Sequence, residues 1–171
     1  LTTANIVGLT TATVAALGSD QMVALGSDAS AFGTGNLAAL TTSNIKGLST
    51  AAVAALTSAQ VSALGSDASA LTTGQLAELT STSIAGLATA AIAAFGSAQI
   101  AALGDDAGAL SSGQLAALTS ANVTGLGTTA LSAITSNGIA GLTSAVAGVL
   151  DSSQVAALGY VASGLGTSAL A

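Results

Sequence analysis

The hydrophobic residues of the chain recur in units of eight, with leucine at position 1 and a β-branched or long aliphatic residue at position 6. The first three units read LTTANIVG, LTTATVAA and LGSDQMVA, and the pattern continues almost to the last residue. In a strand, positions 1 and 6 would point to opposite faces, and Ala and Gly are poor strand residues. In one continuous helix the leucine stripe would drift by about 80° per unit. The pattern therefore predicts a chain that breaks once per unit.

Each unit also contains the residues that start a helix. Position 2 is mostly Thr, Ser or Gly, and position 5 is often an amide, as in TSAQ at 57–60 and TTSN at 41–44. The Gln cases match a capping box, and the Asn cases resemble one with a shorter arm. Helices of about one and a half turns need neighbours to hold them. The predicted fold class is therefore all-α, a solenoid of very short helices, with a β-solenoid as the alternative.

A longer period groups these units. Four octets and one shorter unit, in fourth place, make up the block 1–39, and the same order of lengths returns in 40–78 and 79–117. The chain is divided as a single repeat array over 1–171, with blocks 1–39, 40–78, 79–117 and 118–157 and partial units in 158–171. We interpret one block as one superhelical turn around a narrow interior filled by positions 1 and 6. The array is expected to continue, covalently or by stacking of copies.

With this turn length, residues one block apart would stack along the axis. Two glycine columns follow the spacing: Gly8, Gly47, Gly86 and Gly125, and Gly35, Gly74 and Gly113. They predict sharp corners or close approaches of the backbone. Amides also form columns, such as Gln21, Gln60 and Gln99. These amides would either form an axial ladder of hydrogen bonds or cap their own helices, and the i,i+3 spacing favours capping.

The composition restricts the possible partners. The chain is 51% hydrophobic but has two Phe, one Tyr and no Trp, so the core is predicted to be narrow and aliphatic. Phe32, Phe95 and Tyr160 are expected to fill the core or pack at the ends. The net charge is -6 with Lys46 as the one cation, and nucleic-acid binding is not expected because it requires clustered Lys or Arg. Thr, Ser and Gly interrupt the apolar runs, so no membrane span is expected.

Little in the chain suggests catalysis. It has no His and no Cys, which removes the commonest general base and metal ligand, and we identify no catalytic residue and expect no enzyme activity and no cofactor. One candidate metal site is a column of Asp28, Asp67 and Asp106, whose carboxylates on one edge would bind Ca²⁺. The favoured alternative is that backbone donors in the first turn of each helix stabilise these acids. Asn122 begins an NVT triplet, which fits a glycosylation acceptor.

The uninterrupted octet L-T-x-x-Q/N-I/V-x-A resembles the Ala/Thr/Leu-rich repeat tracts of very large bacterial secreted and surface proteins. The resemblance implies an extracellular or cell-surface location and a structural or adhesive role. We therefore expect a non-enzymatic structural protein, the shaft or subunit of a fibre, filament or giant adhesin. Its expected partner is itself, by end-to-end association or continuation of the same repeat. The alternative is a binding module that presents a repetitive face to ice, polysaccharide or Ca²⁺.

Overall fold

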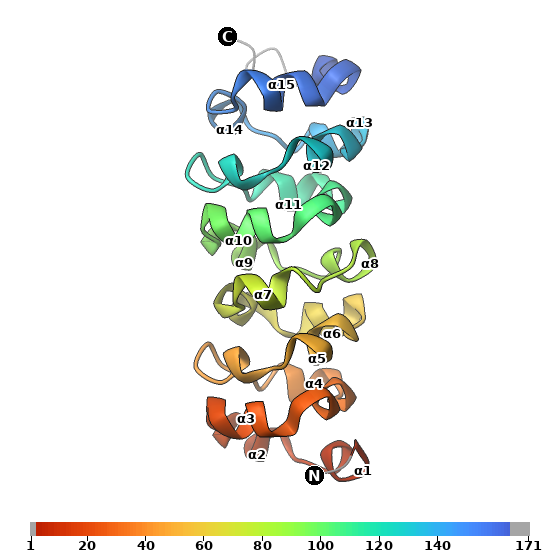
Figure 1. Ribbon diagram of the computed structural model, residues 1–171, viewed down its shortest axis with the longest axis vertical. Helices are drawn as coiled ribbons and strands as arrows, with labels where there is room; N and C mark the ends of the chain where they lie inside the picture. The colour runs from red at the N-terminus through yellow and green to blue at the C-terminus, as the bar shows by residue number, and fades with distance from the viewer. Residues whose placement is uncertain (1–2, 165–171) are drawn as a thin grey trace.

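The computed structural model describes residues 3–164 as one elongated stack of short helices, with no strand in this range. The first and the last α-helix described, Thr3–Val7 and Ser152–Leu158, lie at opposite ends of the long axis (Figure 1). The predicted all-α solenoid of short helices is confirmed, and the β-solenoid alternative is wrong for the described residues. Within the same range, no helix has the length and apolar character needed to cross a membrane.

Two kinds of helix occur along the described part of the chain. The α-helices are α1 (Thr3–Val7), α2 (Thr11–Ala16), α3 (Ser19–Leu25), α4 (Thr34–Leu37), α5 (Thr50–Ala54), α6 (Ser58–Ala63), α7 (Thr73–Leu76), α8 (Ser81–Ile84), α9 (Thr89–Ala94), α10 (Ser97–Ala102), α11 (Ser112–Ala116), α12 (Thr128–Ala133), α13 (Ser136–Ile139), α14 (Ser144–Ala147) and α15 (Ser152–Leu158). The 3₁₀ helices are η1 (Gly26–Ala31), η2 (Ile45–Gly47), η3 (Gly65–Ala70), η4 (Gly104–Ala109), η5 (Val123–Gly125) and η6 (Gly159–Gly164).

Most octets change direction at their first two residues. Leu48, at position 1, is extended with φ -60° and ψ 130°. Ser49 is also extended and is the N-cap of α5. The Ser49 hydroxyl accepts a hydrogen bond of 3.1 Å from the backbone N–H of Ala52, which satisfies a donor at the helix start. The same cap is made by Thr10, Thr57, Thr72, Thr80, Ser111, Thr135, Thr143 and Asp151. The interpretation of these Thr and Ser residues as helix caps is confirmed.

The seven-residue units change direction differently. There the preceding helix runs through the leucine at position 1, as at Leu64 with φ -65° and ψ -20°. The next residue, Gly65, has a φ of 55°, a conformation that favours glycine, and η3 begins with it. Because no extended residue separates the two helices, this corner needs one residue fewer than an octet. In the described range the same left-handed glycine stands at position 2 of four units, as Gly26, Gly65, Gly104 and Gly159.

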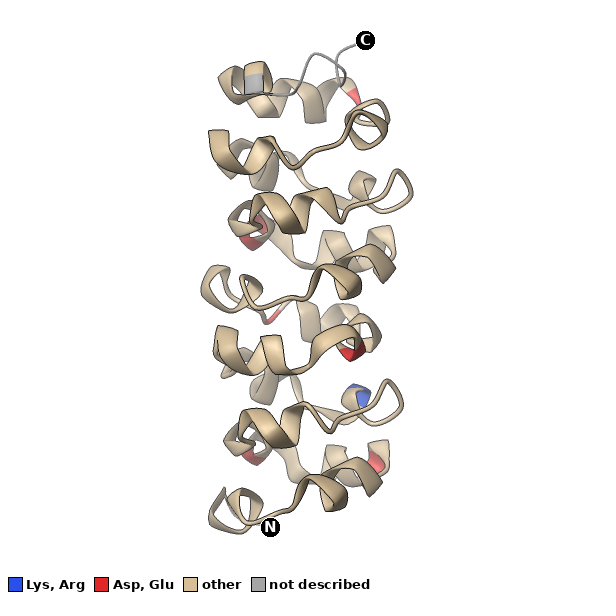
Figure 2. Ribbon diagram, turned by 180° about the vertical axis from the view of Figure 1, so that it is seen from behind, with Lys and Arg blue, Asp and Glu red and all other residues tan. Residues whose placement is uncertain are grey.

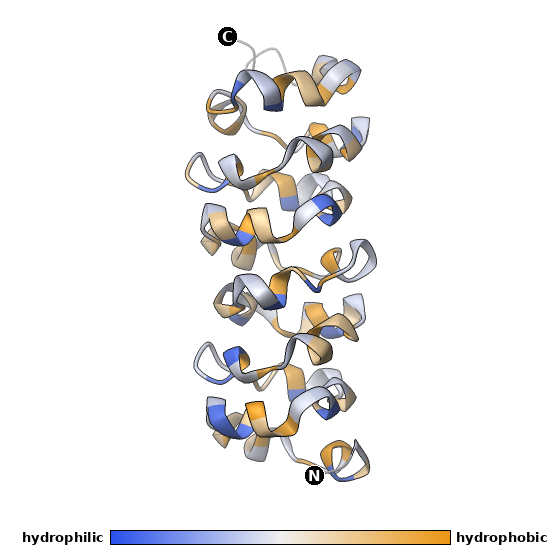
Figure 3. Ribbon diagram, viewed as in Figure 1, coloured by the Kyte–Doolittle hydropathy of each residue, from blue (hydrophilic) through white to orange (hydrophobic). Residues whose placement is uncertain are grey.

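The core is a continuous aliphatic column in the middle of the stack. Buried residues from Ile6 to Val161 form one cluster, and Figure 3 shows hydrophobic segments at every level of the solenoid. Leucines at position 1 and aliphatic residues at position 6 supply most of it, as predicted. Phe32 and Phe95 fill the core, with 0% and 3% of their surface exposed. Tyr160 is 87% exposed, so its expected packing is wrong.

One superhelical turn is shorter than the repeat block. Side-chain hydrogen bonds between neighbouring turns join residues 27 to 30 positions apart, and helices that pack on each other, such as η3 and α9, begin 24 positions apart, so a turn takes roughly 24 to 30 residues, or between three and four units. The interpretation of the block as one turn of five helices is therefore wrong. Five helices around one axis would leave a space that leucine and isoleucine side chains are too short to fill, and interiors are close-packed. Residues one block apart consequently lie on different sides of the solenoid.

The two glycine columns behave differently. A Cβ atom on Gly86 would overlap the carbonyl oxygen of Ser58 in the turn before, so only glycine allows this approach. The predicted close approach is confirmed in the same way at Gly47 and Gly125, and it also occurs at Gly141. The prediction is wrong at four glycines that have room for a Cβ and no positive φ: Gly8, Gly35, Gly74 and Gly113.

Candidate functional site

The amide side chains at position 5 connect neighbouring turns. The carboxamide oxygen of Gln75 accepts a hydrogen bond of 2.8 Å from the N–H of Thr72, just before α7. The amide nitrogen of the same side chain donates to the carbonyl oxygens of Ile45 at 3.1 Å and Leu48 at 2.7 Å, in the turn before. One side chain therefore caps a helix and bonds that helix to the next level of the stack. We call the bonds from such an amide nitrogen to the turn before an amide tie.

The amide tie recurs with a regular geometry. In most ties one acceptor is the carbonyl oxygen at position 1 of a unit, and the other lies two or three residues before it. Gln114, for example, donates to the carbonyls of Ile84 and Leu87, both at 2.9 Å. Amide ties are made by Asn36, Asn44, Gln60, Gln75, Gln99, Gln114, Asn122 and Gln154. The ties fix the register between turns, because each amide reaches particular carbonyls of the turn before.

Several of these amides are deeply buried. Gln75, Gln114 and Asn122 expose only 2%, 4% and 1% of their surface. Burying an amide without partners costs several kcal/mol, about 2 to 7 depending on the reference state. Among the described residues, no buried side-chain nitrogen or oxygen lacks a hydrogen-bond partner. The buried side-chain polar atoms of the described stack are thus satisfied, and removing one member of a tie leaves buried backbone carbonyls without their donor.

The capping interpretation of the amides is confirmed, and the axial ladder is wrong. Reciprocal caps join Thr57 to Gln60, Thr72 to Gln75 and Ser111 to Gln114. At Gly96, which has no side chain, only the bond from its N–H to the Gln99 carboxamide oxygen is made, at 3.0 Å. The ladder fails because the column of Gln21, Gln60 and Gln99 follows the block and not the turn.

The amide tie itself was not foreseen from the sequence. A capping box works with either Glu or Gln at its last position, but only an amide retains N–H donors after its oxygen has capped the helix. Position 5 holds Gln or Asn in many octets and Glu in none. Because the chain has one Glu in all, Glu78, the repeated choice of an amide at position 5 is the signal in the sequence that could have indicated a second use of the amide.

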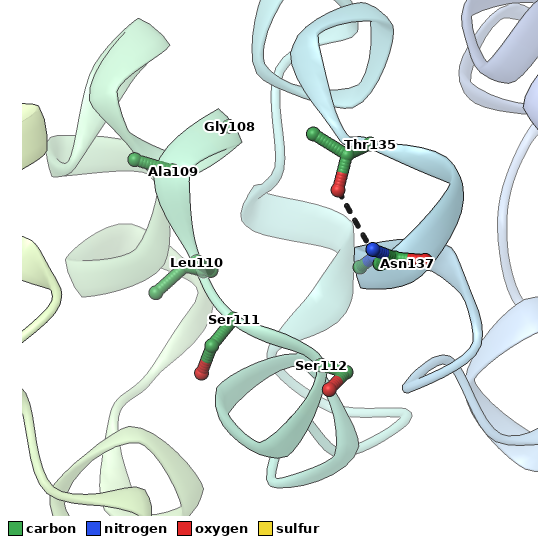
Figure 4. Close-up of a pocket in the computed structure, with 8 residues that line it drawn as sticks. Gly108, Ala109, Leu110, Ser111, Ser112, Thr135 and Asn137 are labelled. Carbon is green, nitrogen blue, oxygen red and sulfur yellow. Dashed lines mark hydrogen bonds between the residues drawn. The ribbon is translucent and has the colours of Figure 1, made fainter.

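One octet has a cavity where others have a tie. Gly138 stands at position 5 of unit 134–141, in the same place of its block as Gln60 and Gln99. A cavity of about 320 Å³ lies beside it, lined by residues 108–112 of one turn and by Thr135, Asn137 and Gly138 of the next. Figure 4 shows the two segments facing each other across it, with the hydrogen bond of 3.1 Å from the Gly138 N–H to the Thr135 hydroxyl.

The candidate calcium column does not form. Asp28, Asp67 and Asp106 lie in the first turns of η1, η3 and η4, as the alternative interpretation has it, but one block is not a whole number of turns. Figure 2 shows acidic residues scattered over both sides of the stack, and Lys46 is the one basic residue of the chain. In residues 3–164, no three His, Cys, Asp or Glu side chains gather into a group that could hold a metal ion.

The NVT triplet is not an accessible glycosylation site. The amide nitrogen of Asn122, the atom that a glycan would occupy, donates to the carbonyls of Ile92 at 2.9 Å and Phe95 at 3.1 Å. The side chain is buried, and its oxygen accepts a hydrogen bond of 2.8 Å from the N–H of Thr119. The sequence pattern is wrong as a modification signal here because it coincides with a tie.

The chain matches the sequence model of one family, described as ALTTAQ repeat, over residues 1–27, 29–66 and 68–105. The second and third matches are separated by one block, so the family repeat has the period of the block and not that of the superhelical turn. The expected Ala/Thr-rich tandem repeat tract is confirmed to this extent. No curated protein and no solved structure matches the chain.

Proposed function

We propose that this chain, which belongs to the ALTTAQ repeat family, serves as a structural shaft, part of an extracellular fibre, filament or giant surface adhesin of a bacterium. In this proposal the function of the chain is to extend a continuous rod. Each turn packs on the turn before it, and the turn after it packs on an equivalent surface. Two features support it, the regular ties between turns and the exposed core positions in the outermost described turns.

The exposure of Val155 is the observation that carries the proposal. Val155 occupies position 6 of its unit, where Met22 and Ile100 expose 0% and 1% of their surface. The turn after covers those two residues: a Cβ on Gly47 would lie 2.6 Å from the Met22 Cβ, and one on Gly125 would lie 3.0 Å from the Ile100 Cβ. Val155, in the last described turn, is 45% exposed. Val155 is therefore a core position that a further turn of the same repeat would cover.

Other exposed hydrophobic residues gather in the outermost turns. In the described part of the chain, every large hydrophobic residue that is exposed lies in the first three or the last three units: Val7, Val23, Val149, Val155 and Tyr160. We propose that these residues contribute to the contact with a further turn or with a second copy. A contact between two different surfaces of successive copies does not close, and it extends into a filament.

The proposal assigns no reaction, cofactor or nucleic acid to the shaft. Seven acids and one Lys in the whole chain provide neither a general base beside a nucleophile nor a basic surface for phosphates. The partner proposed instead is a further turn of the same repeat, supplied by a second copy or by a continuing chain.

Electron microscopy and sedimentation velocity test the proposal. We expect filaments with a uniform width, and a sedimentation coefficient that rises with protein concentration. Val155→Glu should shorten or abolish the filaments because it places a charge on the open core position. Ala156→Glu, an exposed neighbour in α15, is the matched control and should assemble like the natural chain.

Discrete particles at every concentration, unchanged by Val155→Glu, would contradict end-to-end association. The alternative of a binding module would then be tested by thermal hysteresis for ice, by glycan binding, and by a shift of the melting temperature with calcium.

A further inference from the structure

We propose that the cavity at Gly138 is a binding site for a primary carboxamide, the end group of a Gln or Asn side chain. The cavity lies between residues 108–112 and 135–138, which belong to two successive turns. This inference concerns the side of the solenoid and does not depend on end-to-end assembly.

The equivalent site one block earlier shows what such a site holds. Gln99 donates from its amide nitrogen to the carbonyls of Ser69 at 3.0 Å and Leu71 at 2.8 Å, and its oxygen accepts from the N–H of Gly96. Gln60 makes the corresponding bonds to the carbonyls of Ser30 at 3.3 Å and Phe32 at 2.9 Å. The same backbone arrangement therefore receives a carboxamide at two levels of the stack.

The equivalent backbone groups line the cavity one block later. Gly108 and Leu110 take the places of Ser69 and Leu71 in the next block, and Thr135 takes the place of Gly96. All three border the cavity, and Gly138, in the place of Gln99, contributes no side chain to it. The cavity thus occupies the position in which Gln99 and Gln60 hold their carboxamides.

The pattern of donors and acceptors selects the ligand class. At Gln99 two carbonyl oxygens receive donors and one N–H receives an acceptor from a single planar carboxamide, and we expect the equivalent groups of the cavity to accept the same set. A carboxylate has no donor when ionised, and an N,N-dialkylamide has an acceptor only. Thr135 and Asn137 are exposed, so a ligand reaches the cavity from solvent. The cavity is lined by both apolar and polar residues, and its volume accommodates a carboxamide that carries a short alkyl group.

An NMR titration of the ¹⁵N-labelled full chain with propionamide tests the proposal. We expect saturable shifts at the N–H groups of Ala109 and Ser111, which share peptide bonds with the carbonyls of Gly108 and Leu110. The equivalent N–H groups of Ala70 and Thr72, where Gln99 already binds, should not shift. Propionate and N,N-dimethylpropionamide are the matched control ligands and should leave all four signals in place. Equal shifts with N,N-dimethylpropionamide, or none with propionamide, would overturn the proposal.

Two variants, one that fills the cavity and one that creates a second site, keep the test valid if either of them fails to fold. Gly138→Gln should place its own carboxamide in the cavity and abolish the propionamide shifts, with a small movement of Ile134, whose Cγ2 would lie 3.2 Å from the new Cβ. Gln99→Gly should create a second propionamide site at Ala70 and Thr72. If neither variant changes where propionamide binds, the assignment of the cavity as a carboxamide site is wrong.

The source of the carboxamide is settled by a second titration. The ligand in this titration is N-acetylglutamine N-methylamide, which carries a peptide backbone. If it binds more tightly than propionamide, the carboxamide comes from a side chain of another polypeptide, whose backbone adds contacts at the rim of the cavity. Equal affinity indicates a small free amide. If N-acetylglutamine N-methylamide fails to shift the N–H signals of Ala109 and Ser111 while propionamide shifts them, a protein partner at this site is excluded and a small amide is the ligand.

Discussion

Two regions of the solenoid are held together differently. Between residues 40 and 122 the ties follow one another closely, whereas beyond Asn122 only Gln154, among the described residues, reaches back to an earlier turn. Position 5 in the intervening octets is Ala130, Gly138 and Val146, and Val146 is buried with 2% exposure. Both regions keep the same helical stack (Figure 1). Apolar packing therefore suffices for the architecture, and the ties add stability and a defined register to the middle.

The largest difference between the regions is expected from charges placed in the core. Leu64 and Leu142 both stand at position 1 and expose 3% and 4% of their surface. Leu64→Asp should cost about 4 kcal/mol or more and unfold the adjoining turns on both sides, since the charge is buried without a partner. Leu142→Asp should affect mainly the turns beyond Asn122, because fewer ties join those turns to their neighbours. Circular dichroism measures the lost helicity. Equal losses would mean that the two regions unfold as one unit.

The second test concerns the close approach of turns in the tied region. Gly86→Ala should destabilise the fold by about 1–3 kcal/mol, because the added methyl group meets the Ser58 carbonyl and the turns must separate. Gly113→Ala is the control in the other glycine column, where a Cβ has room and lies within α11. It should stabilise the chain by about 0.5–1 kcal/mol through helix propensity. Chemical denaturation measures both. A neutral Gly86→Ala would show that the turns are loosely packed.

Removing one tie should make the middle resemble the end. Gln99→Gly should cost about 2–3 kcal/mol, since it removes a cap and leaves the Ser69 and Leu71 carbonyls without their donor. Gln21→Gly is the matched control, because Gln21 also caps a glycine, Gly18, at 2.8 Å but belongs to the first turn and makes no tie. Its cost should be about 1 kcal/mol. The difference between the two losses in the free energy of unfolding measures the contribution of the tie alone. Equal losses would show that the tie does not stabilise the fold.

The smallest effect is expected from completing a cap. Gly96 is extended at the start of α10, with φ -80° and ψ 165°, a conformation that Thr adopts at the same place in other octets. Gly96→Thr should add the missing bond to the N–H of Gln99 and stabilise the chain by a few tenths of a kcal/mol. Thermal melting of variant and natural chain in one buffer resolves this difference. A lower melting temperature would indicate that the tie needs the smaller residue.

Local structure was predictable because it depends on neighbours within one octet. Thr57 and Gln60 stand three residues apart and form the predicted box, and Leu64 is buried as position 1 requires. The number of octets per turn depends instead on how side-chain volumes fill the axis, and no local pattern states it. The calcium column and the amide ladder were wrong for this one reason. The sequence shows that Gly138 replaces the Gln found at the same place of the other blocks. The cavity that results can be inferred only when the hydrogen bonds of the amide tie are known.

The mismatch between the repeat block and the shorter superhelical turn has a consequence for the proposed shaft. Within the described residues each block is rotated relative to the one before it, so the tight glycine contacts, the left-handed corners and the acids of successive blocks lie on different sides. We therefore expect the proposed shaft to distribute its stiffest contacts over more than one side, and lateral bundling to lack a face that repeats with every block.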